Sequence, residues 1–136
     1  KPWNDVVALN LTAHFQIIRC MEPLLRMSDA GRAVFLTDAS AATAPAYRGP
    51  YAAAQTALQT LVRVWAAELA ITPIKVNLVD PGPTRTKLRA AVMPGEDPVE
   101  LKTPADVAEH IVPLCFPRFA ANGALSEYRN SLSDVA

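Results

Sequence analysis

Hydrophobic residues between positions 3 and 27 recur mostly at three- and four-residue steps. This spacing is typical of a helix, because 3.6 residues per turn bring such positions onto one face. It predicts a long, substantially buried helix, bent near its end by Pro23, which lacks a backbone donor. A polar turn at 28–31 follows. The continuous apolar run at 33–36 then predicts a strand that is covered on both faces in a parallel sheet.

The rest of the chain alternates helix and strand patterns in the same way. A second long helix is predicted over 51–71, where Leu58, Trp65 and Leu69 form a stripe that lies either in the core or against another subunit. A short strand is predicted at 75–79, and a last one at 123–128. Between them we expect a long loop with one helical turn at 85–101 and a helix from the N-cap Thr103 to about residue 114. The polar tail after residue 129 is expected to be frayed.

This order of elements predicts an α/β fold with a parallel sheet and crossover helices. Three strands cannot bury both faces of such a sheet well, and one edge stays open, so we expect further strands from elsewhere. The sequence starts at Lys1 and enters a helix pattern at once. We therefore expect residues 1–136 to be a piece of a longer polypeptide.

Composition narrows the class of protein. Thirteen basic side chains balance thirteen acidic ones, so the basic field that nucleic-acid binding needs is missing. Cys20 and Cys115 have neither disulfide nor metal-ligand spacing, which predicts no metal site and a reducing, cytoplasmic setting. The apolar stretches are far shorter than the roughly 20 residues that span a bilayer, so no membrane association is expected.

Four features in a fixed order carry a family resemblance. Asn10 stands in the first helix, a strand ends near Asp38, Tyr51 follows thirteen residues later, and residues 76–86 read VNLVDPGPTRT. Together these features resemble the short-chain dehydrogenase/reductase family. The stretch 80–106 is similar to bacterial oxidoreductases of that family.

The resemblance implies a Rossmann-like, doubly wound parallel sheet that binds NAD or NADP. Residues 1–136 would be the C-terminal part of that single domain, with about three strands and three main helices. The glycine-rich N-terminal half would lie outside this chain, whose five glycines are scattered, so a dinucleotide site needs further residues. The resemblance also implies a homodimer or homotetramer formed through the helices that carry Asn10 and Tyr51.

The resemblance also implies roles for single residues. Tyr51 occupies the position of the family's catalytic acid/base, and Asn10 that of the asparagine that holds a water on the proton relay. Pro81, Gly82 and Thr86 occupy positions that contact the nicotinamide end of the cofactor.

Two positions depart from the family pattern. Asp38 stands where the family has Ser, with Ser40 two residues on, and Gln55 stands where it has Lys. A tyrosine with its reference pKa near 10 is only about one part in a thousand ionised at neutral pH. A lysine four residues later on a helix would favour the phenolate, whereas Gln55 can only form hydrogen bonds, for example to ribose hydroxyls. An ionised Asp38 would raise the pKa of Tyr51 further.

We therefore expect a nominal NAD(P)-dependent oxidoreductase whose hydride transfer to a carbonyl, or from an alcohol, is weak or absent. A protonated Asp38 could instead donate a hydrogen bond as Ser does, and ketone reduction uses tyrosine as an acid. The alternative function is a catalytically silent binding or scaffolding protein. Taken singly, Gln55 is interpreted as a surface helix residue and Asp38 equally well as a turn cap.

Overall fold

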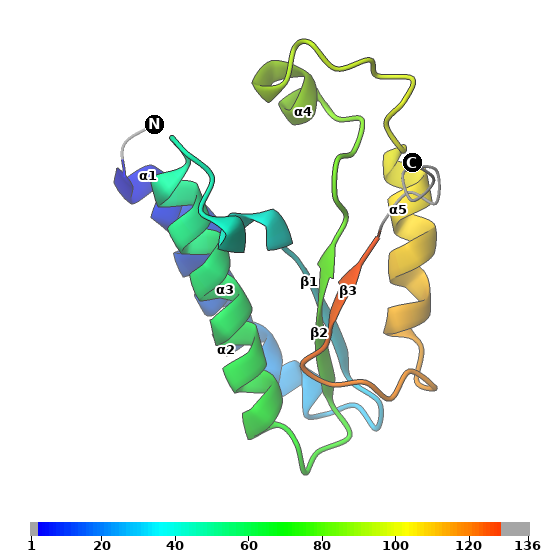
Figure 1. The fold of residues 1–136 in the computed structure, drawn as a ribbon. Coiled ribbons are helices and arrows are strands. Elements are labelled where there is room, and N and C mark those ends of the chain that lie inside the picture. Colours follow the sequence, from blue (N-terminus) through cyan, green and yellow to red (C-terminus); the bar gives the residue numbers. More distant parts are fainter. Residues whose placement is uncertain (1–2, 129–136) are drawn as a thin grey trace.

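The computed structural model describes residues 3–128, so the tail predicted to fray lies outside the described residues. Its centre is a three-stranded parallel sheet of β1 (Arg32–Leu36), β2 (Lys75–Asp80) and β3 (Leu125–Glu127), in the order β1-β2-β3 (Figure 1). Helices α2 and α3 lie on one side of the sheet and α5 on the other (Figure 1). The predicted parallel α/β arrangement is confirmed.

The first helical region consists of α1 (Trp3–Val7), a π-helical turn η1 (Ala8–Thr12) and α2 (Ala13–Leu25). The prediction that it is substantially buried was wrong. Of its described residues only Ile18 is buried, whereas Phe15 and Ile17 are exposed. One face packs toward β1 and α3, and in the described part of the chain no element covers the other apolar face.

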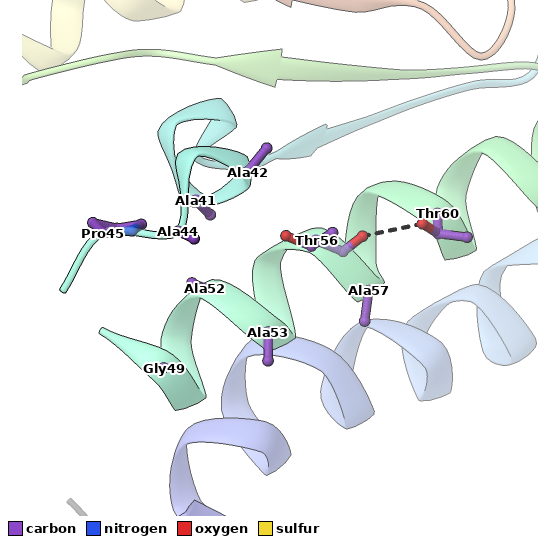
Figure 2. A pocket seen from close by; sticks show the side chains of 10 residues that line it. All are labelled: Ala41, Ala42, Ala44, Pro45, Gly49, Ala52, Ala53, Thr56, Ala57 and Thr60. Carbon is purple, nitrogen blue, oxygen red and sulfur yellow. Dashed lines mark hydrogen bonds between the residues drawn. The ribbon is translucent and has the colours of Figure 1, made fainter. Parts of the chain in front are cut away.

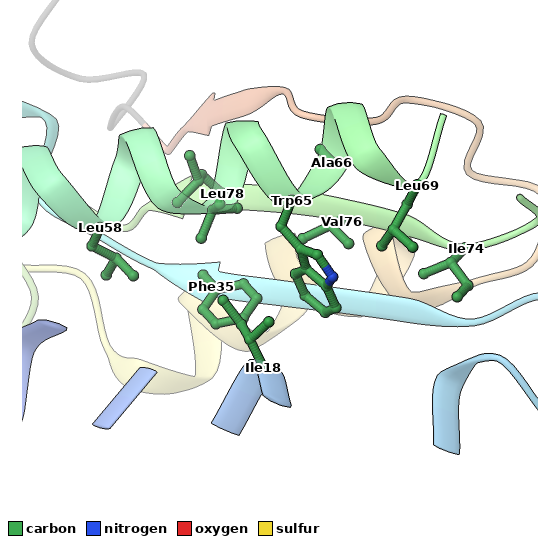
Figure 3. Close-up of a cluster of buried hydrophobic side chains, with 10 residues drawn as sticks. Ile18, Phe35, Leu58, Trp65, Ala66, Leu69, Ile74, Val76 and Leu78 are labelled. Atoms are coloured by element: carbon green, nitrogen blue, oxygen red, sulfur yellow. The ribbon is translucent and has the colours of Figure 1, made fainter. Parts of the chain in front are cut away.

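Helix α3 (Gly49–Glu68) starts two residues before its predicted position. Its apolar face fills the core between α2 and the sheet, where Phe35 meets Trp65 edge-to-face (Figure 3). Leu58, Trp65 and Leu69 are all buried within this chain. The stripe that sequence alone left open is therefore core.

Strand β2, rather than β1, is the strand covered on both faces. Val76, Leu78 and Val79 are fully buried, whereas Leu36 of β1 is 52% exposed. β2 lies between two strands and two layers of helices, whereas β1 is one of the two edge strands of the described sheet and has a neighbour on one side only. The prediction of two covered faces for residues 33–36 was wrong for this reason.

The remaining elements are short and lie around the sheet. A 3-10 turn, η2 (Ala39–Thr43), follows β1, and α4 (Lys87–Val92) is the helical turn expected in the long loop. Helix α5 (Pro104–Ile111) starts with the predicted N-cap, completed as a capping box, and continues into η3 (Val112–Cys115). None of the described helices combines the length and the apolar character needed to cross a membrane.

Candidate active site

Four of the predicted site residues meet at the carboxyl ends of the strands. Asp38 follows β1, Tyr51 and Gln55 lie in the first two turns of α3, and Asn10 lies in η1. The Tyr51 hydroxyl donates to Asp38 Oδ2 at 3.2 Å, and Gln55 Nε2 donates to Asn10 Oδ1 at 3.2 Å. Ligands of open α/β sheets bind at this edge, so the location fits a site.

The Asp38 carboxylate is a hydrogen-bond acceptor toward both Ser40 and Tyr51. Its Oδ1 takes the backbone N–H of Ser40 at 2.9 Å and also the Ser40 hydroxyl, while Oδ2 takes the Tyr51 hydroxyl. Asp38 is thus the N-cap of η2, as one interpretation predicted, and also contacts Tyr51. The geometry uses Asp38 as an acceptor, in contrast to the donor role of a serine.

The surroundings of Tyr51 oppose its ionisation. Burial raises its pKa first, the charge of Asp38 and its hydrogen bond raise it next, and the pKa reaches about 12. Arg48 lowers the pKa by a smaller effect, and Asp80 adds a slight rise. The direction predicted for Asp38 agrees with this result, although half-burial of the phenol contributes more.

Gln55 is buried, so its interpretation as a surface residue was wrong. Its Oε1 accepts from the Thr37 hydroxyl at 3.0 Å and from the Asp38 backbone N–H at 3.2 Å. These two donors determine the orientation of the amide, with Nε2 directed at Asn10. The carbonyl of Gln55 is therefore already used by Thr37 and Asp38, and its amide N–H group donates to Asn10.

Thr37 and Gln59 complete this network and were missed in the sequence. Gln59 Nε2 donates to the Thr37 hydroxyl and to the Asp38 carbonyl, both at 3.2 Å. Both residues are buried. The signal was available, because Gln55 and Gln59 lie four residues apart and so share one face of a buried helix.

The π-helical turn η1 presents Asn10 to the network. The Asn10 Nδ2 group donates to the Val6 carbonyl four residues earlier at 2.9 Å, which leaves Oδ1 for Gln55. Single π-helical turns inside α-helices are frequent at functional sites. The hydrophobic periodicity contains no signal for this local widening.

The Pro81-Gly82 turn is tied to the end of β1 through Asp80. Asp80 Oδ2 accepts from the Ala39 backbone N–H at 3.0 Å, and Oδ1 accepts from that of Gly82 at 2.7 Å. Gly82 has a φ of 61°, and a Cβ there would lie 3.3 Å from Nζ of the buried Lys102. Asp80 and Lys102 were not among the predicted site residues. The sequence indicates these two residues less clearly than it indicates Gln55 and Gln59, since single charged residues beside a turn are common.

Thr86 lies away from the Asn10–Gln55 network. It is exposed and caps α4, where its Oγ1 accepts from the Arg89 backbone N–H at 3.1 Å. The Arg89 guanidinium forms an ion pair with Glu96, which raises the pKa of Arg89. The structure thus brings Pro81 and Gly82 to the sheet edge and places Thr86 at the helix that follows.

The described residues include the positions that the family resemblance assigned to one end of a dinucleotide. The Pro81-Gly82 turn, closely approached by Lys102, and Gln55 are the residues that would hold the nicotinamide end. The sequence contains no glycine-rich turn for the pyrophosphate. Within residues 3–128, no group of three or more His, Cys, Asp or Glu side chains is placed to hold a metal ion.

An open hollow of about 670 Å³ lies between η2 and the first turns of α3 (Figure 2). Only alanine, glycine, proline and threonine line it, and its one side-chain hydrogen bond runs within α3, from Thr60 to the Thr56 carbonyl (Figure 2). The lining contains no acid, base or metal ligand. The candidate active site is therefore the cluster around Tyr51 rather than this hollow.

Comparison with known proteins identifies the family of the chain. A family model described as "Enoyl-(Acyl carrier protein) reductase" matches residues 1–119. The chain is 41% identical over 105 residues to "Uncharacterized oxidoreductase YciK" of Escherichia coli K12, covering 77% of this chain and 41% of that protein.

Solved structures extend the similarity to the fold. A short chain dehydrogenase from Salmonella enterica serovar Typhi superposes with a TM-score of 0.86 at 35% identity, over 92% of this chain and 52% of that one. A structure from E. coli CFT073, complexed with NADPH, gives 0.85 at 36% identity with the same coverage. The chain thus spans about half the length of these structures, and the predicted Rossmann-like class is confirmed. The chain belongs to the short-chain dehydrogenase/reductase family.

Proposed function

We propose that the protein is an NAD(P)-dependent oxidoreductase in which hydride transfer to ordinary ketones, or from alcohols, is weak. Family membership and the NADPH complex of one similar structure support the reaction class and the cofactor. The observation that carries the proposed weakness is the hydrogen bond from Tyr51 to the Asp38 carboxylate. The amide of Gln55, where the family has a lysine, supports it.

A bound nicotinamide would donate or accept the hydride. The protein must then move a proton at the substrate oxygen, which is the task of Tyr51. Tyr51 directs its proton at Asp38 Oδ2, and a phenolate formed there would lie beside a carboxylate. Such a phenolate is disfavoured, in agreement with the raised pKa of Tyr51.

Gln55 cannot offset this charge. A lysine ammonium at that position would favour the phenolate by Coulomb attraction, whereas the amide is neutral. Its two hydrogen bonds from Thr37 and Asp38 and its bond to Asn10 hold it in one orientation. The proton relay from Tyr51 toward Asn10 therefore lacks a positive charge at its centre.

The test is to restore the family residues in the full-length protein. We expect Asp38→Ser combined with Gln55→Lys to raise ketone reduction by about 100-fold, the scale of general acid–base catalysis. Initial rates with NADH and NADPH over a panel of carbonyls and alcohols measure it. Asp29→Ser combined with Gln16→Lys makes the same changes at exposed positions and should leave the rate of ketone reduction unchanged. Ordinary rates in the unmodified protein would contradict the proposal.

A catalytically silent scaffold is the second candidate, and one observation favours it. The outer face of α2 exposes Phe15, Ile17, Met21 and Leu24. This face supports self-association into a homodimer or homotetramer through the helices that carry Asn10 and Tyr51. Calorimetric titration separates the candidates, because a scaffold binds neither nicotinamide nucleotide. Light scattering of Ile17→Glu, which should reduce the particle mass, tests the association itself.

A further inference from the structure

Both hydroxyl groups next to Asp38 direct their protons at its carboxylate. Tyr51 Oη donates to Oδ2, and Ser40 Oγ donates to Oδ1. A hydroxyl has a single proton and two lone pairs, so these two groups present acceptors to anything else that approaches. A ligand that contacts this cluster must therefore supply the hydrogen-bond donor.

The charged residues around Asp38 leave this cluster a hydrogen-bond acceptor for a ligand. Asp80 is a second carboxylate beside Asp38, held by the backbone N–H groups of Ala39 and Gly82. Among the described cations, Arg89 is paired with Glu96 and is also attracted by Asp38. Lys102 is attracted by Asp80 and donates a hydrogen bond from its ammonium group to the Tyr128 carbonyl. Arg48 acts on Tyr51 less strongly than Asp38 does.

We propose, resting on the function proposed above, that the substrate is an iminium cation whose N–H donates to the Asp38 carboxylate beside Tyr51. The iminium carbon accepts a hydride from a reduced nicotinamide nucleotide. One C–H bond of that donor breaks, a C–H bond forms at the carbon, and the C=N π pair becomes the nitrogen lone pair. The substrate is reduced to a neutral amine, and the nucleotide is oxidised.

Carbonyl and iminium substrates place opposite demands on this cluster. Reduction of a carbonyl creates an alkoxide beside Asp38 and needs a proton from Tyr51. Reduction of an iminium removes a positive charge that Asp38 attracts, and the hydride step needs no proton from the phenol. The substitution of Ser by Asp38 therefore impairs the first reaction, whereas for the second it favours binding of the substrate in its protonated form, which is the form that accepts a hydride.

The experiment compares ring-matched probes in the full-length protein. Calorimetry with the oxidised nucleotide present measures binding of pyrrolidinium and of the neutral alcohol cyclopentanol. Initial rates in slightly acidic buffer with the reduced nucleotide compare protonated pyrroline with cyclopentanone. The variants are Asp38→Asn, which removes the charge but keeps the shape and the capping acceptor, and Asp29→Asn as an exposed control.

We expect Asp38→Asn to weaken pyrrolidinium binding by about 10- to 100-fold, the scale of a charge-assisted hydrogen bond. Cyclopentanol binding and the Asp29→Asn control should change little, and the unmodified protein should reduce pyrroline faster than cyclopentanone. Equal pyrrolidinium binding before and after Asp38→Asn, or turnover of the ketone alone, overturns this inference and leaves the reaction class intact. Absence of nucleotide binding overturns the proposed function and this inference with it.

Discussion

The two halves of helix α3 bury the same face, but that face carries apolar side chains in one half and amide side chains in the other. Toward its C-terminal end the face carries Val62, Trp65 and Ala66, which pack in the core without needing partners of a particular kind. Toward its start it carries Gln55 and Gln59, whose amides reach the end of β1. Both halves are buried, but only the half with Gln55 and Gln59 needs a hydrogen-bond partner for its buried polar atoms.

This difference shows where the helix stabilises the fold and where it serves a site. Apolar side chains in the core tolerate changes of similar volume. Buried amides are stable only when donors meet acceptors, and each unmatched group lowers the free energy of unfolding. The start of α3 therefore combines a stability requirement with a preorganised cluster around Tyr51.

The largest expected loss of stability comes from the apolar side chains that α3 buries. Leu58→Ala removes a fully buried side chain and should lower the free energy of unfolding by about 2–5 kcal/mol, because a cavity remains. Denaturant titration followed by circular dichroism measures it. Ile71→Ala, at a position that is 99% exposed, is the control and should have almost no effect. Similar losses for both variants would contradict the assignment of the core.

The second-largest loss of stability is expected for the buried amides of Gln55 and Gln59. Gln59→Met keeps the volume but leaves the Asp38 carbonyl without its donor, so the free energy of unfolding should fall by about 1–3 kcal/mol. The exposed Gln16 provides the matched variant Gln16→Met, which should change little. The same titration compares them. An unchanged free energy of unfolding in Gln59→Met would mean that the network is not needed for stability.

A pH titration sharpens the comparison at Tyr51. Its folded pKa of about 12 lies above the ordinary value of 10, so the folded state holds the phenol proton more tightly. The contribution to stability is present below pH 10 and is lost as the pH rises through about 12. Ultraviolet difference spectra against Tyr51→Phe should show the raised pKa, and Asp38→Asn should lower it. An unchanged pKa in Asp38→Asn would contradict the role given to that charge.

The smallest loss of stability is expected for the hydrogen bond that Trp65 of the apolar half donates to Glu22. Trp65 Nε1 donates to Glu22 Oε2 at 2.8 Å, and the Glu22 side chain is 28% exposed. Glu22→Ala should lower the free energy of unfolding by only about 0.5–1.5 kcal/mol, since water can replace the acceptor. Glu22→Gln keeps an acceptor and should lose less. A loss as large as that of Leu58→Ala would show that this contact matters more than its exposure indicates.

Local patterns predicted much of this structure because they depend on neighbours in the chain. The N-cap at Thr103, the helical turn within 85–101 and the end of β1 near Asp38 all follow from adjacent residues. Family resemblance placed Asn10, Asp38, Tyr51 and Gln55 in one site, and the coordinates bring all four together. Their catalytic roles stay predictions that the variants above test.

Other features depend on contacts between segments far apart in the chain. Burial of Gln55 results from Thr37 and Asn10, which lie 18 and 45 residues away. The exposure of Phe15 and the complete burial of β2 depend on which elements cover each face. Periodicity identifies a face but not its covering partner, so these outcomes were missed.

The sequence by itself determined the order of helices and strands, the caps and the residue types available at the site. Only the tertiary structure decided that Asp38 accepts a hydrogen bond from the Tyr51 hydroxyl and that Gln55 is an interior residue with one amide orientation. The physical reason is that a hydrogen bond is directional and short, so its partners are known only when the strand ends and the helix are placed in space.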